Sequence, residues 1–216
     1  KQTNKYFMKN FKLIDHPIIK RDITTLRDKK TPSSLFRPTL RRISIVMAFE
    51  AARDLHLKTI SVTTPLEKTV GYELKDKIVL VPVLRAGLGI IGGFLDVFSN
   101  ARVGHIGLAR NEKTLEPVDY YFKIPQKIKG SVVFLLDPML ATGGSGSAAI
   151  KFLKQRGAVT VRYVCLVAAP EGIKRISKDH PDVIIYGAAL DRELNEKGYI
   201  LPGLGDAGDR VFGTNE

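Results

Sequence analysis

The sequence contains no tryptophan and one cysteine, and only 8% of its 216 residues are aromatic. A single cysteine, Cys165, excludes an intramolecular disulfide framework and any metal site built from several thiolates. It lies in the apolar stretch VRYVCLVAA, so we expect a buried core thiol. The four histidines show no metal-binding spacing such as H-x-x-x-H, and we expect them to be structural or on the surface.

Long apolar runs are also missing. No stretch approaches the ~20 residues that cross a bilayer, and the basic stretch from Lys1 to Phe11 lacks the apolar centre of a secretory signal. We therefore expect no membrane partner and a reducing, cytoplasmic setting. The hydrophobic content, 44% of 216 residues, suits one α/β domain of ordinary size.

Acidic residues are scarce near the N-terminus. The first 42 residues hold 12 Lys and Arg against three acids, whereas the rest of the chain holds 22 against 19. Most of the net charge of +12 therefore belongs to the N-terminal segment. Two interpretations stay open for that segment: a solvated helical arm, or an anion-binding surface for a nucleic acid, a nucleotide or an effector.

The apolar patterning predicts alternating strands and helices. We expect helices over 16–28, 33–55, 86–98, 144–157 and 170–180, a hairpin or hood over 59–65 and 69–74, and strands over 77–84, 101–109, 118–124, 131–137, 159–169 and 182–190. This alternation predicts an α/β fold with a mainly parallel, twisted sheet flanked by helices. We expect a single domain over 1–216, with an N-terminal helical segment (1–56), an α/β core (77–191) and a C-terminal loop (192–216).

The stretch FLLDPMLATGGSGSAAI, residues 134–150, predicts an anion site. An apolar strand runs into Asp137, and a loop of small residues from Ala141 to Ser147 then opens a helix. Exposed backbone N–H groups and the partial positive charge of a helix start suit a phosphate. No lysine follows the glycines in a G-x-x-x-x-G-K-[ST] pattern, which disfavours an ATPase or GTPase loop.

Further candidate ligand segments lie at or after strand ends, where α/β sheets bind ligands: LRAGLG (84–89) and LARNEKT (108–114). Arg85 and Arg110 could clamp a highly charged group such as a diphosphate. Asp137 could accept hydrogen bonds from vicinal hydroxyls. A sugar with a 5-phosphate and a diphosphate on its anomeric carbon would use all of these groups.

The C-terminal stretch GYILPGLGDAGDRVFGT (198–214) is rich in glycine and shows no helical or strand period. Its apolar residues predict an ordered loop packed on the domain rather than a disordered end. A ligand loop and a structural wrap both fit this pattern.

A dinucleotide-binding oxidoreductase is an alternative, because GLGIIG (87–92) matches G-x-G-x-x-G after a strand and before a helix. Arg110 could then receive a 2′-phosphate. Against it, Arg85 and Ala86 separate the strand from the first glycine, and no acid ends the following strand.

Four motifs resemble those of a known family. VFLLDPMLATGGS resembles the phosphoribosyl-diphosphate signature of type I phosphoribosyltransferases, and GYILPGLGDAGDR closely resembles the uracil-binding loop of uracil phosphoribosyltransferases. VPVLRAGLG and LRDK (26–29) resemble that family too, and the similarity runs from about Phe11 to Thr214. Most type I members carry two adjacent acids at the strand end, but here the second position is Pro138, as in uracil-specific members.

The resemblance implies a set of site residues. For 5-phosphoribosyl 1-diphosphate (PRPP) these are Arg85, Arg110, Asp137, Pro138, Met139, Leu140, Ala141, Thr142, Gly143, Gly144, Ser145 and Asp206. For uracil they are Ile200, Gly205, Asp206 and Ala207, offering backbone groups. Arg85, Asp137 and Asp206 are the implied catalytic residues, and Arg110 opens an implied mobile loop over about 111–118.

The implied reaction transfers the 5-phosphoribosyl group to uracil and releases diphosphate. Magnesium is expected to arrive with the diphosphate substrate, since Pro138 leaves a single acid at the strand end. The resemblance also implies a cis peptide bond between Arg85 and Ala86, and a homodimer or higher homo-oligomer. The alternative is an RNA-binding regulatory protein with the same fold, in which the basic N-terminal segment would bind RNA. The intact GDAGDR motif favours the enzyme.

Overall fold

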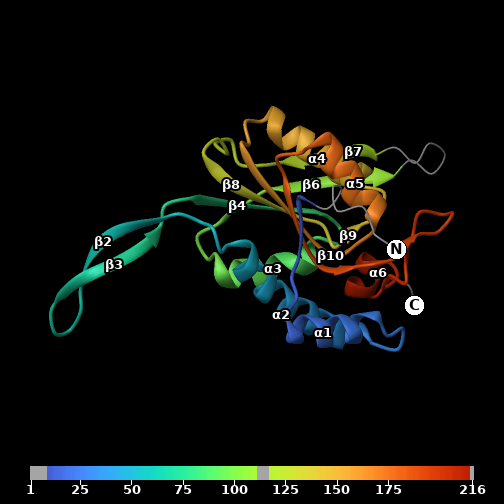
Figure 1. Ribbon diagram of the computed structural model, residues 1–216, viewed down its shortest axis with the longest axis horizontal. Helices are drawn as coiled ribbons and strands as arrows, with labels where there is room; N and C mark the ends of the chain where they lie inside the picture. Colours follow the sequence, from blue (N-terminus) through green and yellow to red (C-terminus); the bar gives the residue numbers. More distant parts are fainter. Residues whose placement is uncertain (1–8, 111–116, 215–216) are drawn as a thin grey trace.

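A computed structural model of the chain describes residues 9–110 and 117–214, with side chains described except at 109, 110 and 117–120. A nine-stranded sheet with the central order β1-β11-β10-β8-β4-β6-β7 forms its centre (Figure 1). Its strands are β1 (Phe11–Leu13), β4 (Lys77–Leu84), β5 (Arg102–Val103), β6 (His105–Arg110), β7 (Pro117–Lys123), β8 (Ser131–Leu136), β9 (Met139–Leu140), β10 (Thr160–Ala168) and β11 (Ile184–Leu190). Every strand pair in the sheet is parallel except β6–β7. The predicted α/β class is thus confirmed.

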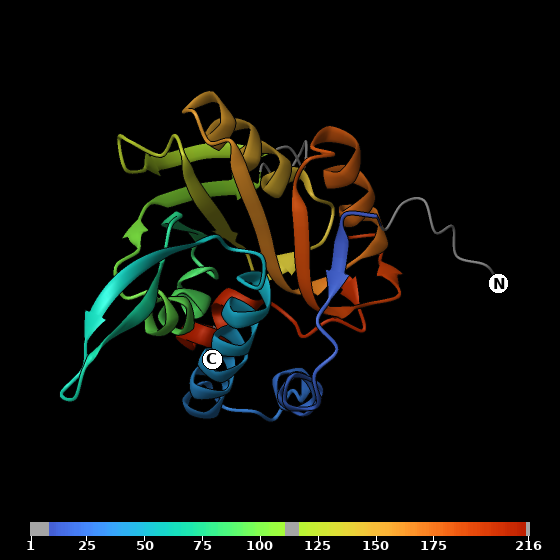
Figure 2. The same ribbon diagram turned by 60° about the vertical axis from the view of Figure 1, so that its left-hand side comes forward.

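Helices cover both faces of this sheet (Figure 2), and its central strands are therefore buried on both sides. One face carries α1 (Pro17–Arg27), α2 (Ser33–Ala51), α3 (Leu88–Val97) and the short α6 (Ala207–Phe212). The other face carries α4 (Gly144–Gln155) and α5 (Pro170–Asp179). Two apolar cores result, one on each side of the sheet. Among the described residues, no helix is long and apolar enough to cross a membrane.

The predicted hairpin is confirmed as β2 (Leu57–Thr63) paired antiparallel with β3 (Lys68–Leu74). It projects away from the body of the molecule (Figure 1). Five of its apolar side chains lie in solvent, namely Leu57, Leu66, Val70, Tyr72 and Leu74, with between 42% and 95% of their surface exposed.

Three predictions of secondary structure were wrong in detail. Residues 101–109 form two strands, β5 and β6, rather than one. The N-terminal segment contributes edge strand β1, whose Phe11 pairs with Ile185 of β11. The C-terminal segment, for which no period was found, forms a small hairpin of β12 (Glu193–Leu194) and β13 (Ile200–Leu201) followed by α6. Strands β1, β5, β12 and β13 have two or three residues each, which is too few to show a period.

Candidate active site

A cavity of about 190 Å³ lies at the carboxyl ends of the central parallel strands. The predicted anion loop forms most of it, and Asp137 follows β8 at its wall. Its lining comprises Val83, Leu84, Leu108, Asp137, Met139, Leu140, Ala141, Thr142, Gly143, Gly144, Ser145, Gly146 and Tyr163. The structure therefore brings together the predicted PRPP residues between Asp137 and Ser145, apart from Pro138, which is not part of the lining.

At Gly143 the predicted anion loop has a backbone conformation that suits anion binding. Gly143 is the N-cap of α4 and is left-handed, with φ 77° and ψ 1°. A side chain there would meet the Gly172 carbonyl oxygen at 2.9 Å, so both conformation and space require glycine. A left-handed residue before a helix start turns successive N–H groups toward one point, and this arrangement binds phosphates.

Pro138 allows the strand to break without losing its backbone hydrogen bonds. Proline has no N–H to donate, but its carbonyl accepts from Leu166 N and Val167 N of β10, at 2.9 and 3.1 Å. Asp137 N donates to Val164 O at 3.0 Å. The sheet is thus held on both sides of the break, which leaves the Asp137 carboxyl at the cavity.

The Asp137 carboxyl has a partner that the sequence did not reveal. Tyr163 of β10 donates its hydroxyl to Asp137 Oδ2 at 2.7 Å. Gly146 makes room for this contact, since a side chain at Gly146 would lie 2.7 Å from the tyrosine ring. Burial raises the pKa of Asp137 to about 6, an increase that the hydrogen bond from Tyr163 opposes.

We predict opposite effects of Asp137→Asn on stability and on binding. Because the folded-state pKa is raised, the folded state binds the proton more tightly, so stability falls as pH rises from about 4 to 6. Removing this charge should raise the free energy of unfolding by about 1–3 kcal/mol at pH 8 and change it little at pH 4. If Asp137 binds the ribose hydroxyls, as the resemblance implies, PRPP affinity should fall about 10- to 100-fold, because a charge-assisted contact would be lost.

Calorimetric unfolding at the two pH values and PRPP titration would check this prediction. Tyr163→Phe serves as the matched control, because it keeps the carboxyl and removes only its hydrogen bond. A variant Asp137→Asn that is less stable at both pH values, with unchanged PRPP binding, would make Asp137 a structural cap.

Arg85 directly follows β4 and lies outside the cavity wall, with 55% of its side chain exposed. Its Nη2 donates to Asp209 Oδ1 of α6 at 2.9 Å. The cis peptide bond is between Leu84 and Arg85, so the expectation for the bond between Arg85 and Ala86 was wrong. The chain already turns into α3 at this point, since the carbonyls of Arg85 and Ala86 accept from Leu88 N and Gly89 N, each at 3.0 Å.

Arg110 ends β6, but its side chain lies outside the described part of the chain, and so do residues 111–116 of the predicted mobile loop. The strand places the Arg110 backbone at the same edge of the sheet as Arg85, because β4 and β6 are parallel neighbours.

The glycines of GLGIIG serve packing. A side chain at Gly87 would lie 2.5 Å from the Leu136 carbonyl oxygen, and one at Gly89 would lie 2.6 Å from Leu40 of α2. The motif therefore lets α3 approach the sheet and α2 closely, which accounts for it without a dinucleotide.

The predicted uracil residues lie on the C-terminal segment, beside α1 and α2. Ile200 and Ala207 are buried, at 5% and 2% exposure, whereas Gly205 and Asp206 are exposed. Asp206 is the N-cap of α6 and accepts from Asp209 N at 2.9 Å. Gly205 has φ 80°, in the left-handed region. The segment is thus an ordered loop, as expected.

Arginine side chains hold this loop in place. Arg27 donates to both carboxylate oxygens of Asp191, at 2.5 and 2.9 Å, and to Gly203 O at 2.7 Å. Asp191 also accepts from Gly203 N at 2.8 Å. Arg210 donates to Leu204 O at 2.9 Å and reaches the carbonyls of Leu26 and Asp28. The LRDK motif therefore supports the C-terminal loop.

Asp191→Ala should destabilise the protein by about 1–3 kcal/mol, because Arg27 and Gly203 N lose their shared partner in a site where Asp191 is only 6% exposed. If this loop binds uracil, as the resemblance implies, the KM for uracil should also rise, since the loop loses its anchor. Thermal unfolding and steady-state kinetics measure both effects. Asp96→Asn is the control, because its pair with Arg41 is exposed. Equal stability of the two variants would contradict the role assigned to Asp191.

Ser147, Asp179 and His180 contact one another near the anion loop, but they do not form a catalytic relay. Ser147 Oγ donates to Asp179 Oδ2 at 2.8 Å and lies 3.0 Å from His180 Nε2. In a relay the carboxylate would orient the imidazole, whereas here the structure pairs it with the serine. The contacts join the end of α5 to the first turn of α4.

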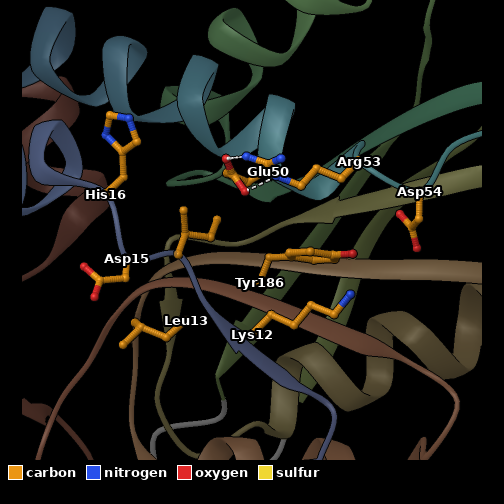
Figure 3. A pocket seen from close by; sticks show the side chains of 9 residues that line it. Lys12, Leu13, Asp15, His16, Glu50, Arg53, Asp54 and Tyr186 are labelled. Atoms are coloured by element: carbon orange, nitrogen blue, oxygen red, sulfur yellow. Dashed lines mark hydrogen bonds and ion pairs between the residues drawn. The ribbon is translucent and has the colours of Figure 1, made fainter.

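A separate cavity of about 540 Å³ lies beside edge strand β1. Figure 3 shows acidic and basic side chains alternating around it: Glu50 accepts both hydrogen bonds from Arg53, and the ammonium of Lys12 lies over the ring of Tyr186, 5.4 Å from its centroid. The lining holds three acids, Asp15, Glu50 and Asp54, against the bases Lys12 and Arg53, so it lacks the positive excess that a polyanion requires.

Two smaller expectations concern single residues. Cys165 is a buried free thiol, as predicted, and burial raises its pKa well above the ordinary value. His16 accepts from Ile18 N at 3.2 Å and so caps α1. Within 9–110 and 117–214, no group of three His, Cys, Asp or Glu side chains could hold a metal ion.

Comparison with known proteins agrees with this geometry. The family model described as uracil phosphoribosyltransferase matches residues 13–214. A uracil phosphoribosyltransferase of Salinibacter ruber is 51% identical over 97% of this chain and 100% of its own, and one of Acholeplasma laidlawii is 54% identical over 94% and 97%. A solved structure of a protein from Aquifex aeolicus has a TM-score of 0.90 at 41% identity, covering 94% of this chain and 97% of its own.

These matches span the anion loop after β8, the arginine after β4 and the C-terminal loop in a single alignment of nearly the whole chain. These matches decide the assignment: the chain belongs to the uracil phosphoribosyltransferase family.

Proposed function

We propose that this protein transfers the 5-phosphoribosyl group of PRPP to uracil, forming uridine monophosphate and diphosphate. The observation that carries the proposal is the left-handed glycine loop at the start of α4, which shares one cavity with the Asp137 carboxyl. A phosphate and a pair of ribose hydroxyls are the groups that such a cavity suits.

Each end of PRPP has its own set of residues in this proposal. The backbone from Ala141 to Ser145 holds the 5-phosphate, with added hydrogen bonds from the hydroxyls of Thr142 and Ser145. Asp137 holds the ribose hydroxyls. Arg85 and Arg110 bind the diphosphate, and Asp206 faces it from the C-terminal loop. Backbone groups of Ile200 and of Gly205 to Ala207 bind uracil.

To catalyse this transfer, the protein must stabilise the charges that develop in the transition state. As diphosphate leaves, positive charge develops on the ribose and negative charge on the leaving group. Arg85 meets the leaving group, while the loop after β13 holds the uracil ring nitrogen in line with the anomeric carbon. Magnesium, brought with the diphosphate substrate, would neutralise part of the charge of the leaving group.

Several arginines of the basic N-terminal segment form ion pairs within the fold. Arg21 and Arg42 share Asp22, Arg27 binds Asp191, and Arg41 binds Asp96. Four arginines are thus paired with three aspartates, which gives these arginines a structural role and supports the interpretation of a helical arm.

Diphosphate release in the presence of uracil, PRPP and magnesium, measured beside binding of a mixed-sequence RNA, tests the proposal. We expect uracil-dependent release of diphosphate and no RNA binding at physiological salt. RNA binding without diphosphate release would overturn the enzyme assignment and support the regulatory alternative.

We also propose a homo-oligomer, assembled through the hairpin β2–β3. An isolated two-stranded hairpin is marginally stable in water, yet this one exposes Val70 and Tyr72 at 60% and 67%. Both lie on one face, together with Leu57 and Leu74. A second copy of the chain would cover these side chains.

Replacing Val70 and Tyr72 with lysine should convert the oligomer to a monomer, because two charges would enter an apolar contact. Light scattering after size exclusion measures the mass. Thr69→Lys, on the opposite face of β3, should leave the mass unchanged. A monomeric wild-type chain would contradict this proposal.

A further inference from the structure

The two segments assigned to the two substrates touch each other. Arg85, in the loop after β4, and Asp209, in the first turn of α6, are 124 residues apart in sequence, and their side chains are 2.9 Å apart at Nη2 and Oδ1. Their backbones also approach, since a side chain at Gly208 would lie 3.7 Å from the Ala86 Cβ. One ion pair therefore joins the diphosphate loop to the base loop.

Asp209 is the fixed partner of this pair. Its Oδ1 also accepts from Thr214 Oγ1 at 2.5 Å, and its N–H donates to Asp206 Oδ1 at 2.9 Å. Its carbonyl accepts from Gly213 N at 2.7 Å. Only 21% of its side chain is exposed. These contacts hold the carboxylate in one position on α6.

Arg85 is the partner that keeps unused hydrogen-bond donors. A guanidinium carries five N–H donors, and the hydrogen bond to Asp209 uses only one nitrogen, Nη2. Within the described part of the chain, Arg85 makes no other hydrogen bond or ion pair. A long exposed side chain loses rotamer freedom when it binds a ligand, and a carboxylate that already orients it lowers that cost.

We propose that Asp209 is a positioning residue for Arg85: it orients the guanidinium so that the donors left over bind the diphosphate of PRPP. The inference rests on the proposed function. It also links the two loops, because displacement of α6 would release Arg85. The opposite possibility is that Asp209 competes with diphosphate for Arg85, in which case its removal would strengthen PRPP binding.

Calorimetric titration with magnesium–PRPP, in the absence of uracil, separates these possibilities. We expect Asp209→Ala to weaken PRPP binding about 10- to 100-fold, as for loss of a hydrogen bond to a charged group. Asp209→Asn should lose less, because its amide oxygen can still accept from Arg85 and Thr214. Asp209→Glu should restore part of the affinity, because it keeps the charge.

A double-mutant cycle tests whether the effect passes through Arg85. In an Arg85→Ala background, Asp209→Asn should weaken PRPP binding by less than about twofold. Asp96→Asn is the control, since it weakens another exposed Arg–Asp pair, which joins Arg41 of α2 to Asp96 of α3 at 2.6 Å. It should leave PRPP affinity unchanged.

Three results would overturn the inference. The first is tighter PRPP binding by Asp209→Asn, and the second is unchanged PRPP binding by Asp209→Ala. The third is a loss of PRPP affinity on Asp209→Asn that is as large in the Arg85→Ala background as in the wild type, which would indicate a purely structural role for Asp209. Wild-type protein that binds no PRPP would overturn both this inference and the proposed function. If the wild-type protein binds PRPP and the Asp209 variants bind it with the same affinity, the inference alone is overturned.

Discussion

Replacing Arg85 with alanine is expected to lower kcat about 10³-fold while the KM for uracil changes by less than about threefold. The leaving diphosphate gains negative charge in the transition state, so a guanidinium at its side stabilises that state more than the ground state. Arg85 directly follows β4, and its side chain is more than half exposed. No described basic side chain takes its place at the cavity, whose lining includes neither lysine nor arginine.

Steady-state kinetics with each substrate varied in turn measure this effect. Arg41→Ala is the matched control, because Arg41 is also exposed and paired with an aspartate, but lies on α2 away from the strand ends. Wild-type turnover by Arg85→Ala would remove Arg85 from the proposed mechanism.

Uracil should be preferred to cytosine by about 10³-fold in kcat/KM. The segment from Ile200 to Ala207 offers few side chains able to bind a base: Ile200, Leu204 and Ala207 are buried in the core. Recognition then falls to backbone groups. A carbonyl would accept from the ring N–H between the two carbonyls of uracil, and N–H groups would donate to its oxygens.

Cytosine reverses two of these features, because its ring nitrogen accepts and its exocyclic amine donates. The loop cannot rotate to adapt, since Arg27, Asp191 and Arg210 hold its backbone by hydrogen bonds. Each mismatched pair of groups costs about 1–3 kcal/mol where the bound base shields it from water. A kcat/KM ratio below about tenfold would be too small for two mismatches and would contradict reading by the backbone.

Gly205→Val tests the same loop from the other side. Gly205 has φ 80°, a conformation that β-branched residues rarely adopt. We expect the substitution to lower kcat/KM for uracil at least about tenfold, since it shifts the backbone groups that bind the base.

Most of the fold followed from the sequence because its elements are long and repeat their pattern. The strand KIVLVPVL and the helix beginning at Pro170 carry an apolar run or a helical period that only one structure satisfies. Strand β1 did not follow, because three residues show no period and its pairing with β11 joins positions far apart in the chain.

The site was predicted where chemistry lies in consecutive residues and missed where it depends on register. The loop from Asp137 to Ser145 is continuous, so its cavity could be expected. Tyr163 reaches Asp137 only because β10 pairs with β8 in a register that places Tyr163 opposite Leu135. Asp209 reaches Arg85 only after α6 folds over α3, and neither contact leaves a pattern in the sequence.

The identity of the product nucleotide tests the central claim most directly. Wild-type protein would be incubated with magnesium–PRPP and equal concentrations of uracil, cytosine and guanine, and the nucleotides and diphosphate would be quantified by liquid chromatography with mass detection. We predict uridine monophosphate alone, with one diphosphate released per nucleotide formed. Absence of any nucleotide, or comparable amounts of cytidine or guanosine monophosphate, would contradict the account.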